Sequence, residues 1–285
     1  MLVISEVYMK RNLDICVLSD FHLGTHGCRA TELRAYLQTI EPARLILNGD
    51  IFDAWYFKKK YFPSSHWEVI EKILQMANSG TMVYYLAGNH DGILHRFQSI
   101  DLGNIRLRSQ LELRIKDKTY WFFHGDAFDV SVLISPLLAK LGGRGYDWLI
   151  RVNAIVNRWR LSLGYSKISF AHRVKRSVKK AVKFIADFEK QAIEAGMKKG
   201  VDAVICGHIH QPCIKTIKKE NREILYMNSG DWVENLSALE YRDGRWRIFR
   251  FGDTDQTHLD EFLSHLEDDQ YVFSQSDKKS GERAL

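Results

Sequence analysis

Short apolar runs alternate with helix-like segments along the first third of the chain. Residues 15–18, 45–47 and 82–86 are continuous β-forming apolar runs, which are typical of strands buried on both faces. Between them, residues 31–40 and 66–77 carry apolar side chains at helical spacing. This alternation predicts an α/β sheet with crossover helices.

Three further apolar runs, 121–123, 203–206 and 224–227, each lead directly into a polar cluster. In open α/β sheets, ligands bind in the crevice at the carboxyl ends of the strands. We therefore expect the polar residues that follow these strands, although distant in sequence, to converge on one site.

The pattern changes after residue 128, because about 70 residues pass without a strand signal. One apolar stripe at helical spacing contains Val174, Val178, Ala181, Val182, Ile185 and Phe188, and another face carries Lys175, Lys179 and Lys183. We predict a helical insertion at about 130–200. Its other apolar residues, such as Trp148 and Trp159, either cover the site, hold a lipid-like group or pack against each other.

The predicted organisation is one domain at 1–250, which contains this insertion, followed by a tail at 251–285. The tail begins with a helix-like pattern (Leu259, Phe262, Leu263 and Leu266) and ends in polar residues typical of disorder.

Charge is concentrated in the insertion. Residues 131–200 hold 15 Lys and Arg against four Asp and Glu, whereas the whole chain has a net charge of +6. Such asymmetry points to an anionic partner: phosphate, nucleic acid or acidic lipid. Because the basic residues are interleaved with apolar ones, a lipid is favoured over a bare polyanion, and no nucleic acid partner is expected.

The sequence favours a cytoplasmic protein. No apolar stretch approaches the roughly 20 residues needed to span a bilayer, and residues 1–10 lack the pattern of a secretory signal. The four cysteines show no C-x-x-C spacing, and Cys16 and Cys206 lie inside predicted strands, where we expect them to be buried.

Five polar clusters recur in a fixed order, nearly all of them after an apolar run. They are Asp20-x-His22, Gly49-Asp50-x-x-Asp53, Gly88-Asn89-His90-Asp91, His124-Gly125-Asp126 and Gly207-His208-x-His210. Singly each is a weak signal, since a lone histidine is usually a hydrogen-bonded core or surface residue and a Gly-Asp pair is usually a turn. Five in sequence make a coincidence very improbable.

Together the clusters supply a two-metal coordination shell. Asp20 and His22 are expected on one side of their strand, because alternate strand residues share a face. Asp50 could bridge two ions with both carboxylate oxygens, and Asn89 offers a neutral oxygen. The histidines that complete the set are His124, His208 and His210.

Mixed oxygen and nitrogen ligands without thiolate suit manganese, iron or zinc and disfavour a closed structural zinc site. Two ions roughly 3.5–4 Å apart can lower the pKa of a bridging water and clamp the oxygens of an in-line phosphoryl displacement. Phosphoester hydrolysis is the predicted reaction.

The order and spacing of the five clusters resemble those of the calcineurin-like metallophosphoesterase family over roughly residues 13–250. The resemblance implies a β-sandwich flanked by helices, here with a lid-like helical insertion. It also implies the ligand sets: Asp20, His22, Asp50 and His210 for one ion, and Asp50, Asn89, His124 and His208 for the other.

The resemblance also implies roles for the remaining polar residues. His90 would contact the phosphate and stabilise or protonate the leaving oxygen, and Asp91 would orient His90. Asp53 and Asp126 are expected to support histidines or loops, and a plain surface role for Asp126 stays open.

Within that family the chain is most similar to the UDP-2,3-diacylglucosamine pyrophosphatases of lipid A biosynthesis. The similarity rests on the residues 19–24 and 48–53, on His124-Gly125-Asp126 and on the insertion before the fifth cluster. It implies two manganese ions, hydroxide attack on the α-phosphorus, and release of UMP and 2,3-diacylglucosamine 1-phosphate. The reaction would take place at the cytoplasmic membrane face, where the basic insertion could bind anionic headgroups.

One position departs from that subfamily: well-known members carry arginine where this chain has His90, whereas histidine is usual in the wider family. Other functions therefore stay open, namely a phosphodiesterase acting on cyclic nucleotides or nucleic acid, a phosphoprotein phosphatase, or a non-catalytic protein-binding scaffold. The scaffold is disfavoured because every ligand position is filled.

Overall fold

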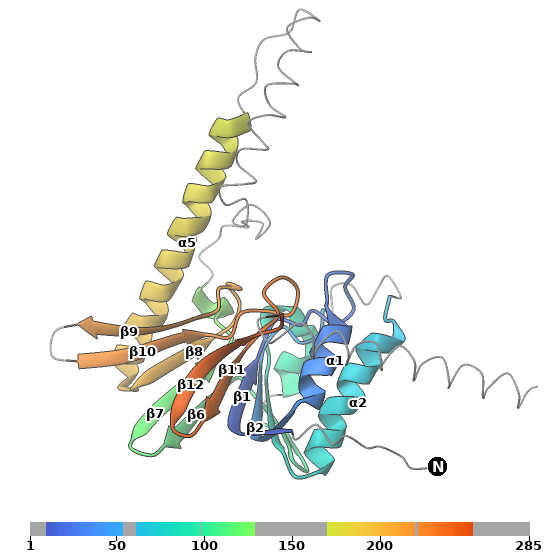
Figure 1. The fold of residues 1–285 in the computed structure, drawn as a ribbon. Coiled ribbons are helices and arrows are strands. Elements are labelled where there is room, and N and C mark those ends of the chain that lie inside the picture. The colour runs from blue at the N-terminus through green and yellow to red at the C-terminus, as the bar shows by residue number, and fades with distance from the viewer. Residues whose placement is uncertain (1–9, 54–60, 98, 129–169, 220–221, 253–285) are drawn as a thin grey trace, which may run out of the picture.

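The computed structural model describes residues 10–53, 61–97, 99–128, 170–219 and 222–252. Two β-sheets pack face to face, with helices on the outer face of each (Figure 1). The predicted sandwich flanked by helices is thereby confirmed. The long basic stretch at 131–169 and the tail from 253 lie outside the described residues.

The larger sheet has seven strands, with the parallel strands that were predicted at its centre. Their spatial order is β12 (Arg245–Arg250), β11 (Ser237–Arg242), β1 (Arg11–Leu18), β2 (Ile40–Asn48), β3 (Met82–Leu86), β5 (Ile105–Arg108) and β4 (Asp101–Leu102). Helices α1 (Ala30–Gln38) and α2 (Ser64–Asn78) make the β1–β2 and β2–β3 crossovers.

The smaller sheet has five strands. Their order is β6 (Gln110–Ile115), β7 (Lys118–Phe123), β8 (Ala203–Cys206), β10 (Arg222–Asn228) and β9 (Cys213–Lys219). The remaining described elements are the 3-10 helices η2 (Asn89–Phe97) and η3 (Asp126–Phe128) and the long helix α5 (Phe170–Lys199). Helix α5 packs its carboxyl-terminal half on this sheet and extends past it (Figure 1).

Burial on both faces explains the continuous apolar runs. In β1, Ile15 and Val17 point into the core between the sheets, while Cys16 and Leu18 point into the core under α1 and α2. In β8, Ile205 faces the core between the sheets, and its neighbours face α5. A strand covered on both sides needs apolar residues at every position. Cys16 and Cys206 are fully buried, as predicted.

Two details of the helix predictions were wrong. The first helix ends at Gln38 rather than at residue 40, because Ile40 already pairs with Arg11 as the first residue of β2. In α5, Ala181 is buried whereas Val182 is 60% exposed. Neighbouring helical positions are about 100° apart, so only one of the two can face the sheet.

Candidate metal centre

The five predicted clusters converge at one end of the sandwich. Asp20 and His22 follow β1, Asp50 follows β2, and the Asn89 cluster follows β3. The last two clusters follow β7 and β8 of the other sheet. Since β1, β2 and β3 are parallel neighbours, and so are β7 and β8, the carboxyl ends of both sheets meet here, as expected for an α/β site.

The backbone at the site is left-handed rather than extended. Asp20, His22, Asp50, His208 and His210 all have φ between 52° and 66°. Such φ values cost a non-glycine residue roughly 1–2 kcal/mol and persist only where the surroundings enforce them. Asp20 and His22 therefore face the same site because of this turn. The expectation that they share a strand face was wrong, since both lie beyond the end of β1.

Backbone hydrogen bonds between the loops after β1 and β2 enforce this turn. The Asp20 amide donates to the Gly49 carbonyl (3.0 Å) and the His22 amide to the Asp50 carbonyl (3.0 Å). Leu23 and Phe52 then form an isolated bridge. The two loops are thus fixed to each other, and with them the carboxylates they carry.

Two glycines allow the loops to pack this closely. A methyl group on Gly49 would lie 2.4 Å from the His124 ring, and one on Gly88 would lie 2.4 Å from Oδ1 of Asp50. Gly49 also has φ of +88°. Both glycines of the predicted clusters are therefore required by close packing against ligand residues.

The first group of ligand atoms comes from Asp20, His22 and His210, whose donor atoms all lie within 4.8 Å of one another. Oδ1 of Asp20 is 3.1 Å from Nε2 of His210, and Oδ2 accepts the His208 amide (3.0 Å). The sequence had assigned these three residues to the same ion.

The second group comes from Asp50, His124 and His208. Nδ1 of His124 must donate to the carbonyl of Asn48 (2.9 Å), since a carbonyl can only accept, and this leaves Nε2 facing the site. That atom lies 3.2 Å from Oδ2 of Asp50 and 3.2 Å from Nδ1 of His208. A carboxylate and two imidazoles therefore converge.

Asp50 joins the two groups through one oxygen. Its Oδ2 faces His124 and also lies 4.0 Å from Nε2 of His22 in the first group. Its Oδ1 accepts the His90 amide (2.8 Å). The expectation that both oxygens bridge two ions stays a prediction, because an oxygen that accepts one amide can still bind a cation through its second lone pair.

Asn89 supplies the test of whether the site fits a metal. Its Oδ1 is buried and has no hydrogen-bond partner among the described residues. A buried, unsatisfied oxygen costs about 1–3 kcal/mol unless another group satisfies it. An uncharged oxygen at a site already rich in carboxylate and imidazole suits a divalent cation, so the residues fit the metal that the sequence predicts.

Comparison with known proteins identifies the family. Residues 13–212 match the family described as calcineurin-like phosphoesterase. The chain belongs to this family. Its members bind a dinuclear metal centre, and the two ligand groups above are where such a centre would lie.

Eight curated relatives carry the name UDP-2,3-diacylglucosamine hydrolase. A UDP-2,3-diacylglucosamine hydrolase of Chromohalobacter salexigens is 27% identical over 258 residues, covering 86% of this chain and 96% of that protein. The enzyme of the same name from Porphyromonas gingivalis is 25% identical, covering 75% and 88%. A solved archaeal phosphodiesterase aligns over 83% of this chain and 98% of its own, with 12% identity and a TM-score of 0.41.

Charges in this phosphoesterase site are strongly coupled. Burial opposes ionisation of Asp50, but the facing imidazole of His124 more than offsets this effect and lowers the pKa of Asp50. The imidazole of His210 lowers the pKa of Asp20 in the same way, again against the effect of burial. Burial likewise opposes a charge on His124 and His210, yet Asp50 and Asp20 raise their pKa values to about 10 and about 9. The site therefore attracts positive charge.

Asp53 supports two histidines at once. Its Oδ2 lies 3.4 Å from Nδ1 of His22 and 3.1 Å from Nδ1 of His90. Burial would raise the pKa of Asp53, but these imidazoles lower it. The supporting position predicted for Asp53 agrees with these contacts, and the carboxylate fixes which ring nitrogen of His22 faces the metal ligands.

Asp91 has a different neighbourhood from the one expected. Its buried carboxylate accepts hydrogen bonds from the hydroxyl of Tyr85 and from four backbone amides, those of Asp50, Ile51, Phe52 and Gly88. The carboxylate that contacts the His90 ring is that of Asp53. Asp91 thus holds the turn that presents Asp50, and orienting His90 falls to Asp53.

Asp126 is the predicted support residue without a visible contact. It begins η3 and is half-buried. Among the described residues, no hydrogen bond or ion pair involves its carboxylate. The structure does not bring it together with the two ligand groups.

Three further residues support the ligand histidines without having been assigned a role from the sequence: Asp231, Asn235 and Asn48. Asp231 follows β10, with Oδ2 3.9 Å from Nδ1 of His210, and Asn235 donates to the His210 carbonyl (2.8 Å). Asn48 holds His124 through its carbonyl and donates its side chain to the Phe123 carbonyl (3.1 Å). The polar run at 228–231 was a signal, since it also follows a strand, whereas Asn48 stood out only as the first residue of the stretch 48–53.

Proposed function

We propose that the protein is a di-metal hydrolase that cleaves the diphosphate bond of UDP-2,3-diacylglucosamine to give UMP and 2,3-diacylglucosamine 1-phosphate. One ion would be held by Asp20, His22, Asp50 and His210. The other would be held by Asp50, Asn89, His124 and His208. The observation that carries the proposal is that these side chains form two groups of metal-ligating atoms, which Oδ2 of Asp50 joins by facing both His22 and His124. The buried, unsatisfied oxygen of Asn89 adds a further ligand atom.

Two bound ions would supply Lewis acidity, drawing charge from the phosphoryl oxygens and lowering the pKa of the attacking water. The chain's own residues supply positioning. His90, whose ring is held by Asp53 at 3.1 Å, is assigned to the phosphate and its leaving oxygen. Asp91 keeps the Asp50 turn rigid through its backbone contacts.

The substrate assignment rests on the relatives and on the insertion. Both curated relatives named above are UDP-2,3-diacylglucosamine hydrolases, and this chain covers most of their length. In the described half of the insertion, α5 exposes Val182 and Lys183 side by side. An apolar and basic helix suits a substrate that carries acyl chains and a diphosphate.

We place the reaction at the cytoplasmic face of the membrane, with manganese as the ion. None of the described helices is long and apolar enough to cross a bilayer. The basic insertion would favour an anionic headgroup layer, by roughly 1 kcal/mol per Lys or Arg near the surface.

The test is hydrolysis of UDP-2,3-diacylglucosamine in detergent by the purified, manganese-loaded chain in water enriched in oxygen-18. We expect UMP release, with the heavy oxygen in UMP, because attack at the α-phosphorus adds the water oxygen to the nucleotide. Heavy oxygen in the sugar phosphate would instead show attack at the β-phosphorus. Absence of UMP would reject the substrate.

A second candidate, another phosphodiester, is favoured by one residue: His90 stands where well-known members of the subfamily have arginine. The same preparation should therefore be assayed on cyclic nucleotides, aryl phosphodiesters and phosphopeptides. Turnover of one of these well above that of the nucleotide-lipid would replace the substrate and keep the metal mechanism. Metal analysis that found fewer than two ions per chain after manganese loading would count against the mechanism itself.

A further inference from the structure

A cluster of arginines covers the edge of the larger sheet, away from the metal centre. Arg245 and Arg247 lie on β12, the edge strand, and are exposed. Arg242 is the cross-strand neighbour of Arg245, and Arg11 extends over the ring of Phe249. We call these four residues the arginine face. They line a cavity of about 450 Å³.

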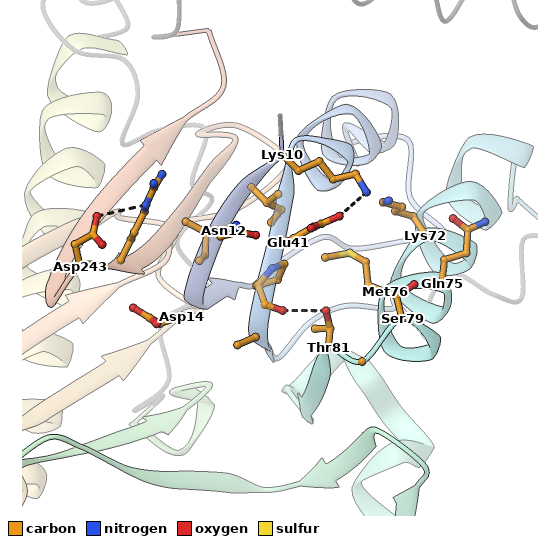
Figure 2. Close-up of a pocket in the computed structure, with 16 residues that line it drawn as sticks. Lys10, Asn12, Asp14, Glu41, Lys72, Gln75, Met76, Ser79, Thr81 and Asp243 are labelled. Atoms are coloured by element: carbon orange, nitrogen blue, oxygen red, sulfur yellow. Dashed lines mark hydrogen bonds and ion pairs between the residues drawn. The ribbon is translucent and has the colours of Figure 1, made fainter. Parts of the chain in front are cut away.

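The carboxylates next to the arginine face are already engaged. Glu240 accepts Arg11 (2.9 Å) and the hydroxyl of Tyr36 (2.8 Å), and Asp243 pairs with Arg242 (3.4 Å; Figure 2). Within the part of the chain that the structure describes, no carboxylate pairs with Arg245 or Arg247. The face therefore carries surplus positive charge.

Half-buried aromatic residues border these arginines. Side chains two apart on a strand share a face, which puts Arg245, Arg247 and Phe249 together. Phe249 and, just beyond the strand, Phe251 are only partly covered by the core under α1. A ligand that fits here would combine carboxylates with apolar side chains.

We propose that residues 253–269 of the same chain bind along the arginine face. This segment contains seven Asp and Glu and no Lys or Arg. It also carries the apolar residues Leu259, Phe262, Leu263 and Leu266 at helical spacing. Its carboxylates complement Arg245 and Arg247, and its apolar residues complement Phe249 and Phe251.

The connection makes this contact easy to form. The described chain leaves β12 at Arg250 and ends at Gly252, so the segment begins at one end of the strand that it would cover. The six residues of β12 span roughly 20 Å. Seventeen residues span about 25 Å even as a helix, so the segment can return along the whole strand.

Covering β12 also addresses a liability of the fold. An edge strand presents unpaired backbone groups to other chains, and natural proteins protect such edges with charges or with a covering segment. The arginines provide the charges, and residues 253–269 would provide the cover. This proposal is independent of the proposed function.

The test is amide hydrogen exchange of the full chain. We expect amides in 253–269 to exchange more slowly than those of an unstructured peptide, and to lose that protection in the variant Arg245→Glu/Arg247→Glu. Raising the salt to about 1 M should weaken it as well, because the Debye length falls to about 3 Å. Adding Asp260→Arg/Glu261→Arg to the first variant should restore protection by exchanging the charges.

The matched control is Arg114→Glu/Lys118→Glu, which reverses two exposed charges on the smaller sheet and should leave the protection unchanged. Thermal unfolding by circular dichroism would establish that all variants are folded. Unprotected amides in the wild-type chain, or protection that persists in Arg245→Glu/Arg247→Glu, would overturn the proposal. Protection seen only at concentrations where light scattering detects a dimer would assign the face to the tail of a second copy, and would equally overturn it.

Discussion

Charged and ionisable side chains have different surroundings at the two ends of the strands. At the carboxyl ends, Asp20, Asp50 and His124 are buried, and their pKa values are displaced by one another. At the amino ends, a groove of about 810 Å³ is lined by exposed charges such as Lys10, Glu41 and Asp14 (Figure 2). There Lys10 pairs with Glu41 at 2.7 Å, and 43% and 57% of the two side chains are exposed.

Burial is the reason for the difference. A short ion pair at the surface is screened by water and contributes little, whereas charges in a dry, crowded site strongly change each other's protonation. Backbone geometry follows this division only in part: five of the nine left-handed non-glycine residues of the described chain are ligand residues, whereas Asp243 lines the amino-end groove. An interatomic distance alone therefore says little about an ion pair, and its surroundings decide its effect.

The largest expected effect is loss of catalysis in Asp50→Ala, which removes the oxygen shared by both ligand groups. A metal site contributes several kcal/mol to transition-state stabilisation, so we expect activity to fall on the order of a thousandfold or more. Steady-state assays and metal analysis measure it. Asp14→Ala, at the exposed end of the sheet, is the control and should keep full activity; equal losses in both variants would contradict the comparison.

Next in size is the stability of Asp91→Ala. The change removes the carboxylate that accepts the hydroxyl of Tyr85 and four backbone amides, three of them in buried hydrogen bonds. Each buried group left unsatisfied costs about 1–3 kcal/mol. We expect the free energy of unfolding to fall by at least about 3 kcal/mol, as measured by urea denaturation. A loss no larger than that of Asp14→Ala would mean that Asp91 does not hold the Asp50 turn.

Asp53→Asn should reduce activity by about 10–100-fold, as expected when a carboxylate supporting metal-bound histidines is removed. The pH–rate profile should shift too, since Asp53 contacts His90. Asp126→Asn is the matched variant and should change activity by less than about twofold, because its carboxylate makes no hydrogen bond or ion pair among the described residues. Equal activity in the two variants would contradict the role of Asp53 in supporting the metal-bound histidines.

A smaller effect concerns pH and requires the ion-free protein. The folded pKa values of His124 and His210, about 10 and about 9, lie above the unfolded value of about 6.5. Their pairing with carboxylates therefore stabilises the fold fully below pH 6.5 and is lost as the pH rises through 9 to 10. Asp20 and Asp50 have lowered pKa values, so on the acid side stability is lost as the pH falls below about 4.

Melting temperatures in EDTA between pH 4 and 10 would measure this profile. Manganese should raise the melting temperature more at pH 9 than at pH 6, because the histidines must lose their protons to bind it. A flat profile from pH 6.5 to 10 without metal would show that the histidines are not held in their charged form.

The smallest expected effect is at the opposite end of the sheet. Lys10→Ala removes an exposed ion pair with Glu41 and should leave the melting temperature unchanged within error. A clear destabilisation would show that the amino-end groove holds charges more tightly than its exposure indicates.

Much of the fold could be predicted from the sequence, because strands buried on both faces need unbroken apolar runs. The strands β1, β3 and β8 were found in this way. Strands such as β9 and β12 were not, since each has an exposed face and mixes apolar residues with Lys or Arg. Their place is set by pairing with β10 and β11, which sequence pattern does not reveal.

The sequence by itself determined which residues can bind metal, and that they lie at strand ends, because both follow from side-chain chemistry and local pattern. Only the tertiary structure decided how they are held. The left-handed turn at Asp20 depends on a hydrogen bond to Gly49, and His90 meets Asp53 rather than its neighbour Asp91. Such contacts join loops that are distant in sequence, so they exist only once both sheets are packed.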